Sequence, residues 1–300
     1  MQSMQVPAAA LSALALLVPG AAGLAAEADS RLTRAAPAIE SEIAGSGAEV
    51  AVAFARLDDG ASWLLRPDEP FHAASTMKVP VLIELYRQAH AGRLHLGDSL
   101  LIRNQFPSLV DGSPYSLDPS DDSEADLYRA VGESRTLAEL SELMITVSSN
   151  LATNLLIERL GVGNIQQGTR ALHAEGMQVL RGVEDSKAFE QGLNNTTTAR
   201  ALLTLMEAIA RGQAVDADAS RAMRAILERQ TFNDGIPAGL PAGTRVAHKT
   251  GEITRIQHDA AIVYAPRPFV LVILTRGIAE PKESAALIAA ITRRLYAASQ

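Results

Sequence analysis

Apolar and polar positions alternate near both ends of the chain, which is the pattern of half-buried β-strands. Residues 49–56 (EVAVAFAR) show it most clearly, and Asp58-Asp59-Gly60 then predicts a tight turn into a return strand over 62–65. Far downstream, the same reasoning predicts three further strands, over 245–248, 259–264 and 269–275. The two ends of the chain therefore supply the strands of the expected sheet.

Outside these strands, apolar residues recur at helical spacing. Residues 31–43 and 280–298 predict flanking helices, and the long stretch from 75 to 228 is mostly helical. Within it, segment 106–125 is rich in Ser, Pro and Asp and predicts a surface loop.

This order of elements favours an α/β (α+β) fold: an antiparallel sheet built from both chain ends, with flanking helices and an inserted all-helical lobe. The sheet lobe would comprise about residues 29–74 and 235–300, and the helical lobe about residues 75–234. A cleft between the two lobes is the natural place for a binding site.

The amino-terminal segment reads as an export signal. Residues 6–26 form an apolar run rich in Ala and Leu, and Ala26-Glu27-Ala28 fits a cleavage site. We therefore expect residues 1–28 to be a signal peptide and 29–300 the exported domain, in the periplasm or secreted. Because MQSMQ carries no Lys or Arg, an uncleaved membrane anchor is the alternative, and it also places the domain outside the cytoplasm.

Composition narrows the classes of function. The 300-residue chain is 47% hydrophobic and 20% charged, an ordinary globular balance. Its net charge of −7 makes nucleic-acid binding unexpected. The absence of cysteine excludes thiolate catalysis and cysteine-ligated metals, and the six histidines lack metal-ligand spacing. Without a glycine-rich phosphate loop either, no metal and no other cofactor is expected.

Lysine is rare in this chain. Only four of the 27 basic residues are lysines, namely Lys78, Lys187, Lys249 and Lys282. A lysine can lose its proton when buried, whereas an arginine effectively cannot. The lysines that persist are therefore candidates for chemistry.

Ser75 and Lys78 open a helical stretch and lie three residues apart, so they share one face. A serine becomes a nucleophile when a nearby base takes its proton, and a desolvated lysine can serve. The plainer interpretation is an N-capping serine followed by a surface lysine.

Two further motifs occur at points where elements meet. Ser148-Ser149-Asn150 joins two predicted helices, and simple helix capping would also explain it. Lys249-Thr250-Gly251 ends a predicted strand, where a charge, a hydroxyl and a closely approachable backbone suit a carboxylate. The alternative for Lys249-Thr250-Gly251 is an ordinary edge-strand lysine before a turn.

Ser-x-x-Lys, Ser-x-Asn and Lys-Thr-Gly, in this order, form the combination found in class A β-lactamases and penicillin-binding proteins. From about residue 30 to the carboxyl end, the chain resembles the penicillin-recognising serine hydrolases, and most closely the class A β-lactamases. The resemblance implies that the lactam carbonyl acylates Ser75. It also implies that Lys78 is the base or proton relay and that Ser148 passes a proton to the leaving nitrogen.

The resemblance also implies a set of binding groups. Asn150 would hold the side-chain amide of the substrate, and Lys249 and Thr250 its carboxylate. The N–H groups of Ser75 and Glu252 would form the oxyanion hole, beside Gly251. Arg255 could add positive charge for the carboxylate.

The family's deacylating glutamate has two candidates here. Glu190-Gln-Gly-Leu193-Asn194 fits the Glu-x-x-Leu-Asn pattern and favours Glu190, whereas Glu184 lies three residues after Arg181. Asn195 replaces the Asp that usually closes this loop on the arginine. If neither glutamate reaches the acyl-enzyme, the protein would acylate and stall.

The expected function is a serine hydrolase that opens the β-lactam ring of penicillin- and cephalosporin-type antibiotics. One alternative is a D-alanyl-D-alanine peptidase or esterase of the same fold. Another is a penicillin-binding sensor or a non-catalytic cell-wall-binding module. The partner is a small molecule, and a monomer is expected.

Overall fold

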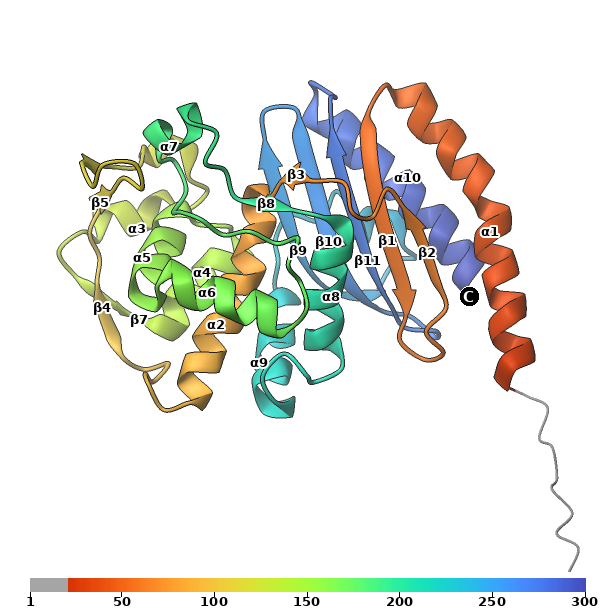
Figure 1. Cartoon of the computed structure of the whole chain (residues 1–300), viewed down its shortest axis with the longest axis horizontal. Helices are drawn as coiled ribbons and strands as arrows, with labels where there is room; N and C mark the ends of the chain where they lie inside the picture. Colours follow the sequence, from red (N-terminus) through yellow and green to blue (C-terminus); the bar gives the residue numbers. More distant parts are fainter. Residues whose placement is uncertain (1–20) are drawn as a thin grey trace, which may run out of the picture.

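The computed structural model describes the backbone from residue 21 onward and side chains from residue 30 (Figure 1). Most of the predicted export segment, residues 1–20, lies outside the described residues. Among the helices described, none combines the length and the apolar character needed to cross a bilayer.

A five-stranded sheet forms the centre of the fold, in the order β2-β1-β11-β10-β9. Every neighbouring pair of strands is antiparallel. The strands are β1 (Glu49–Arg56), β2 (Ser62–Leu65), β9 (Arg245–Ile253), β10 (Ile256–Tyr264) and β11 (Phe269–Arg276). The predicted sheet from both chain ends is confirmed, although β9 continues five residues past its predicted end.

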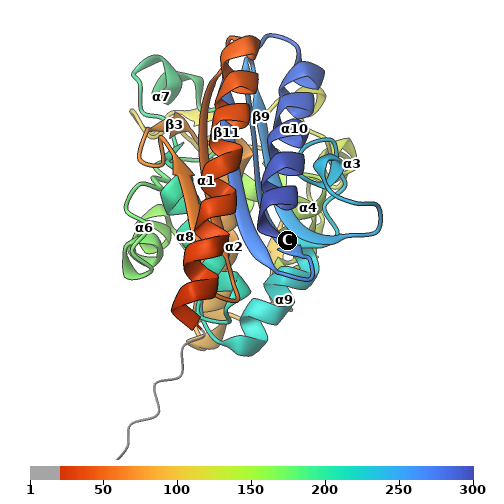
Figure 2. The same cartoon turned by 90° about the vertical axis from the view of Figure 1, so that its right-hand side faces the viewer.

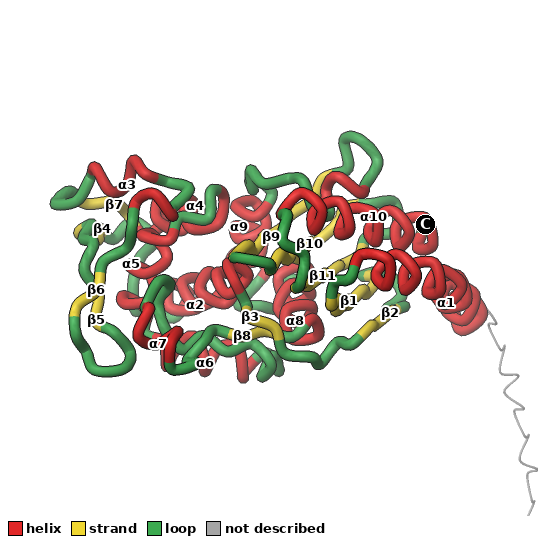
Figure 3. Tube along the Cα trace, turned by 90° about the horizontal axis from the view of Figure 1, so that it is seen from above, coloured by secondary structure: helices red, strands yellow, loops and turns green. Residues whose placement is uncertain are grey.

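Both faces of the sheet are covered by helices. On one face, α1 (Ala21–Ser46) and α10 (Pro281–Ser299) lie side by side (Figure 2), and α8 (Ala199–Ala210) packs on the other (Figure 3). Alternation along β1 sorts its side chains between the two cores. Val50, Val52 and Phe54 face α1 and α10, whereas the small Ala51, Ala53 and Ala55 face α8.

The inserted lobe lies beside the sheet (Figure 1) and is mostly helical. Its helices are α2 (Lys78–His90), α3 (Ala125–Arg129), α4 (Leu137–Thr146), α5 (Asn150–Leu160), α6 (Val162–Ala171), α7 (Ser186–Glu190) and α9 (Ala217–Leu227), with the 3₁₀ turns η1 (Ala74–Met77) and η2 (Pro119–Asp121). A third 3₁₀ turn, η3 (Pro237–Gly239), follows the lobe and packs on α10.

The inserted lobe is mostly helical, with two features that the predicted all-helical lobe did not include. Short strands occur in it. β8 (Thr196–Thr197) pairs with β3 (Phe71–His72), which lies in the predicted sheet lobe. Within the helical lobe, β4 (Ser99–Leu101) pairs with β7 (Ser134–Thr136), and β5 (Phe106–Pro107) pairs with β6 (Pro114–Tyr115). The last pair and η2 lie inside the predicted loop 106–125. In addition, α8 leaves the lobe to cover the sheet, because its apolar face packs on β1, β10 and β11.

The start of α2 explains how Pro80 is tolerated one turn after Ser75. The helix begins as the 3₁₀ turn η1 and becomes α-helical only at Lys78, so Pro80 is the third residue of α2. Proline is tolerated in the first turn of an α-helix, where its fixed φ suits the helical backbone.

Gly239 tests how tightly η3 packs on α10. A Cβ at this position would lie 2.4 Å from the carbonyl oxygen of Ala289 and 2.6 Å from Cβ of Thr292. We expect Gly239→Ala to lower the free energy of unfolding in urea by about 1–3 kcal/mol. Gly45→Ala is the control, since nothing lies within 4 Å of its Cβ position, and it should be neutral or slightly stabilising. Equal effects of the two variants would contradict this packing.

Candidate active site

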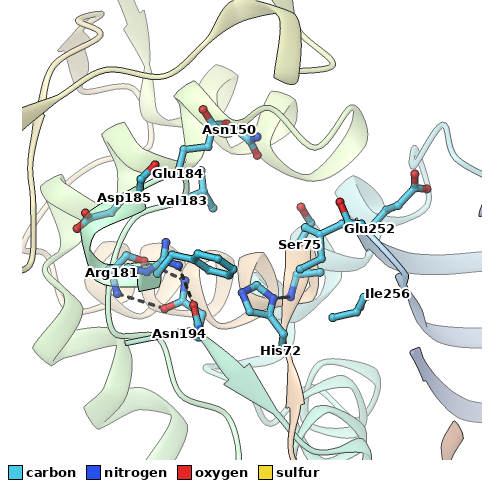
Figure 4. Close-up of a pocket in the computed structure, with 16 residues that line it drawn as sticks. His72, Ser75, Asn150, Arg181, Val183, Glu184, Asp185, Asn194, Glu252 and Ile256 are labelled. Carbon is cyan, nitrogen blue, oxygen red and sulfur yellow. Dashed lines mark hydrogen bonds between the residues drawn. The ribbon is translucent and has the colours of Figure 1, made fainter. Parts of the chain in front are cut away.

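A cleft lies between strand β9 and the helical lobe. It consists of two adjoining cavities, each of about 600 Å³, and Ser75, Asn150 and Glu252 line both (Figure 4). Ser75 comes from η1, Asn150 from the start of α5 and Glu252 from β9. The site therefore assembles from segments that are far apart in the sequence.

Lys78 joins the first two motifs. It is fully buried, and its Nζ donates to the carbonyl oxygen of Ser148 at 2.6 Å, to Oγ of Ser148 at 3.1 Å and to Oδ1 of Asn150 at 2.9 Å. Residues three apart in a 3₁₀ turn lie on the same side, so Lys78 and Ser75 share the side that faces the cleft. The predicted pairing of the two motifs in one site is thus present.

Lys249 brings in the third motif. It is also fully buried, and its Nζ donates to Oγ of Ser148 at 3.0 Å and to the carbonyl oxygen of Thr250 at 2.9 Å. The hydroxyl of Ser148 therefore accepts from both lysines. Since a hydroxyl has two lone pairs, its own proton remains available to a third group.

The charges of the two lysines are set by burial. Burial lowers the pKa of Lys78 to about 7, although the carboxylates of Asp122 and Glu184 oppose the shift. Burial and then the charge of Lys78 lower the pKa of Lys249 well below its usual value, against the opposing effect of Asp259. Two buried amines that share one acceptor disfavour each other's protonation. One of them can therefore act as a base near neutral pH.

Gly251 allows β9 to lie directly against the turn that carries Ser75. A Cβ at Gly251 would lie 3.1 Å from the backbone nitrogens of both Ser75 and Thr76. A two-residue turn joins Ile253 to Ile256, so these two residues form a hydrogen-bonded pair of the antiparallel ladder. Hydrogen-bonded and non-hydrogen-bonded pairs alternate along such a ladder, so the N–H of the preceding residue, Glu252, points away from β10. Because β9 is the edge strand, this N–H faces the cleft.

Of the two candidate glutamates, the structure places Glu184 in the site. Its Oε1 accepts from Nδ2 of Asn150 at 2.8 Å, and its Oε2 accepts from the backbone N–H of Asp118 at 3.3 Å. Burial raises the pKa of Glu184, the bonds from Asn150 and Asp118 oppose this, and other nearby carboxylates reinforce it. The same Asn150 amide thus links Glu184 to Lys78.

The motif-based preference for Glu190 is corrected. Glu190 is exposed, ends α7, and lines neither cavity that contains Ser75. Asp185 caps α7 and Phe189 faces the cleft, so the next residue along the helix points away. The match of Glu190 to the family pattern therefore places it at the end of a short helix, on the side away from the cleft.

The loop that carries Glu184 is closed by an amide and not by an ion pair. Asn195 accepts from the backbone N–H groups of Leu180 and Arg181 and donates to the carbonyl oxygen of Arg181. The guanidinium of Arg181 donates to the oxygens of Leu193, Gly182 and Asn194. The substitution of Asn for the usual Asp thus keeps the loop closed by a different set of bonds.

The remaining predicted binding residues lie along the second cavity. Thr250 lines it from β9, and Arg255 lines it from the β9–β10 turn. Arg255 is exposed and donates to the carbonyl oxygen of Gly277, which holds its charge at the rim of the cleft. In the described part of the chain, no group of three or more His, Asp or Glu side chains is placed to bind a metal ion.

Sequence reasoning missed Asp122, which fixes the start of α5. Its Oδ2 accepts from the N–H groups of Asn150 at 2.8 Å and Leu151 at 2.9 Å, and from the hydroxyl of Tyr128 at 2.9 Å. A carboxylate at a helix N-terminus satisfies N–H groups that lack helical partners. Asp122 lies in the acidic loop, 28 residues before Asn150, so no short-range pattern could reveal its partner.

Comparisons with known proteins agree with this geometry. The family model described as "Beta-lactamase enzyme family" matches residues 34–299. A β-lactamase of Bacillus licheniformis is 30% identical over 76% of this chain and 72% of its own length. A mutant of PBP-A, solved as an acyl-enzyme complex with penicillin G, is 30% identical with a TM-score of 0.75, over 89% of this chain and 96% of that one.

An ancestral class A β-lactamase, from the last common ancestor of Gram-negative bacteria, has the same fold. It superimposes with a TM-score of 0.77 at 23% identity, over 89% of this chain and 99% of that one.

Asp122 can be tested through stability. Asp122→Ala removes the acceptor of two helix N–H groups and of the Tyr128 hydroxyl, so we expect it to lower the free energy of unfolding in urea by about 1–2 kcal/mol. Asp121→Ala is the matched control, because that side chain is exposed, and its effect should stay within about 0.5 kcal/mol. If the two variants unfold at the same urea concentration, Asp122 does not anchor α5.

Proposed function

The chain belongs to the beta-lactamase enzyme family, and from that premise we propose that it opens the β-lactam ring of penicillins and cephalosporins through an acyl-enzyme on Ser75. One observation carries the proposal: Lys78 and Lys249 both donate to the hydroxyl of Ser148, in a cleft whose lining includes Ser75, Ser148 and Glu184.

In acylation, Ser75 Oγ attacks the lactam carbonyl carbon while neutral Lys78 takes its proton. The N–H groups of Ser75 and Glu252 stabilise the negative charge that develops on the carbonyl oxygen. When the carbon–nitrogen bond breaks, Ser148 passes its proton to the lactam nitrogen and takes up the proton that Lys78 received from Ser75. Its position between the two lysines suits this transfer.

Substrate binding uses the second cavity. The substrate carboxylate would bind Lys249 and Thr250, with Arg255 adding charge at the rim. An arriving carboxylate favours the protonated form of Lys249, so this buried lysine becomes an ion-pair partner only when substrate is present. Asn150 would hold the amide of the substrate side chain.

In deacylation, Glu184 takes a proton from a water that attacks the ester carbonyl carbon. The bond from that carbon to Ser75 Oγ then breaks, and the proton held by Glu184 returns to the serine oxygen. A raised pKa makes a carboxylate a stronger base, so the partial burial of Glu184 suits this role. Glu190 is not proposed for it, because of its exposed position.

The assignment of deacylation to Glu184 and not to Glu190 is tested with Glu184→Gln and its matched control Glu190→Gln. We expect Glu184→Gln to form the penicillin acyl-enzyme but to hydrolyse it roughly 10²- to 10⁴-fold more slowly. Glu190→Gln should turn over like the wild type. The mass of the intact protein, followed over time after mixing with penicillin, measures both steps.

The same time course separates the competing functions. Rapid acylation of Ser75 without release in the wild type would indicate a penicillin-binding sensor, and slow release with cleavage of D-alanyl-D-alanine peptides would indicate a peptidase. No mass increase in the wild type, or an increase that persists in Ser75→Ala, would refute the acyl-enzyme on Ser75.

The pKa of Lys78 predicts the pH dependence of acylation. Only neutral Lys78 can take the serine proton, and its pKa is about 7. The loss of neutral Lys78 should therefore leave the acylation rate constant well above pH 7 and lower it by roughly tenfold for the first pH unit below the pKa, before any second group titrates. Lys78→Arg should abolish acylation at every pH, because a guanidinium keeps its proton. Stopped-flow mixing with a chromogenic cephalosporin measures the rate, and a flat profile from pH 5.5 to 8.5 would exclude Lys78 as the base.

We also propose that the protein is exported and acts as a monomer in the periplasm or outside the cell, where it would confer resistance to β-lactam antibiotics. The apolar run over 6–26 and the Ala26-Glu27-Ala28 site support export.

A further inference from the structure

His72 belongs to none of the motifs, yet it lies three residues before Ser75. It forms β3 with Phe71, and β3 pairs with β8. The imidazole lines the first cavity together with Ser75 and points back to the turn that carries the serine (Figure 4). Any effect of His72 on Ser75 would therefore pass through the backbone that joins them.

The ring acts on the turn through one hydrogen bond. Nδ1 of His72 accepts from the backbone N–H of Ala74 at 3.0 Å. Ala74 has a φ of +45°, in the left-handed region that side chains other than glycine rarely adopt. The hydrogen bond therefore supports a strained residue directly before Ser75. An Nδ1 that accepts must carry no proton.

A second imidazole holds the other side of the same turn. Nε2 of His258 donates to the carbonyl oxygen of His72 at 2.8 Å, while its Nδ1 accepts from the N–H of Thr275 at 3.1 Å. A carbonyl oxygen can only accept, so His258 carries a proton on Nε2; its Nδ1 also lies 2.8 Å from the carbonyl oxygen of Gln257. It is fully buried, which lowers its pKa to about 4 and keeps it neutral under most conditions.

His72, in contrast, borders the cleft and several charged groups. Burial and then the positive charge of Arg181 lower the pKa of His72. The carboxyl groups of Glu184, Asp185 and Glu252 line the same cavity from the opposite loop and from β9. The neutral ring is thus the form that the surroundings favour, and acid converts it to a form that cannot accept from Ala74.

We propose that His72 is a positioning residue for the nucleophile: its neutral imidazole holds the N–H of Ala74 and thereby sets the direction of Ser75, and protonation of the ring releases this turn. An imidazolium would place an N–H against the N–H of Ala74, two donors without an acceptor. The functional consequence rests on the proposed role of Ser75, whereas the hydrogen bond can be tested without substrate.

The first test is a nuclear magnetic resonance titration of the whole protein. We expect the His72 ring to carry its proton on Nε2 at neutral pH, and the amide signals of Ala74 and Ser75 to shift with the same midpoint as the ring. In His72→Asn, those amides should show no such transition. An Nδ1–H tautomer, or amides that do not follow the ring, would overturn the proposal.

The second test measures the acylation rate with a chromogenic cephalosporin between pH 5 and 8. An asparagine oxygen can accept from the N–H two residues on, so His72→Asn should retain most of the wild-type rate at neutral pH. His72→Leu has no acceptor and should acylate on the order of 10- to 100-fold more slowly at every pH, with unchanged circular dichroism.

The pH profile distinguishes His72 from Lys78. Two groups that must both be neutral make the wild-type rate fall with a slope that steepens from one towards two in acid, whereas His72→Asn should keep a slope of one. His95→Asn, an exposed histidine in the loop after α2, should behave as wild type. A normal rate in His72→Leu, or steepening that persists in His72→Asn, would contradict the proposal. A wild type that is never acylated would instead refute the proposed function, and the titration would still decide the role of His72.

Discussion

The site depends on two buried amines that share one hydroxyl. Lys78 in the helical lobe and Lys249 in the sheet both donate to Oγ of Ser148, so this one oxygen links the two lobes. Burying two cations this close is unfavourable, and the fold lessens the cost by letting them be neutral and by placing Asp122, Glu184 and Asp259 around them. The burial that makes the two lysines costly to charge is also what allows a lysine to be neutral and act as a base.

Backbone strain gathers around this centre. Ala74, Ser148 and Glu184 all have positive φ angles, and each supplies or adjoins a group in the cleft. Such residues persist only where their surroundings determine them. Asp122 fixes the start of α5, Gly251 lets β9 close on the serine turn, and His72 and His258 hold that turn from two sides. Residues outside the motifs thus keep the motif residues in place.

The sequence predicted what depends on local pattern. Alternation predicted the strands of the sheet, and the family resemblance carried by the three motifs predicted that Ser75, Lys78, Ser148 and Lys249 share one site. It failed for partners that only folding brings together. The bond from Asp122 to Asn150 has no periodicity, and the motif that favoured Glu190 cannot show that α7 turns outward. The two- and three-residue strands of the helical lobe were missed because they are too short to show alternation.

The four lysines show how composition becomes chemistry. Lys187 pairs with Asp111 on the surface and Lys282 is exposed at the start of α10, roles that arginine fills elsewhere in this chain. The other two are completely buried, and for Lys78 an arginine would not serve, because a guanidinium would remain charged where the proposed mechanism needs a neutral amine. A chain that otherwise uses arginine for charge therefore keeps lysine where a proton must leave. The use of lysine at this buried position, in a chain that mostly uses arginine, indicates a base more strongly than the presence of a lysine alone.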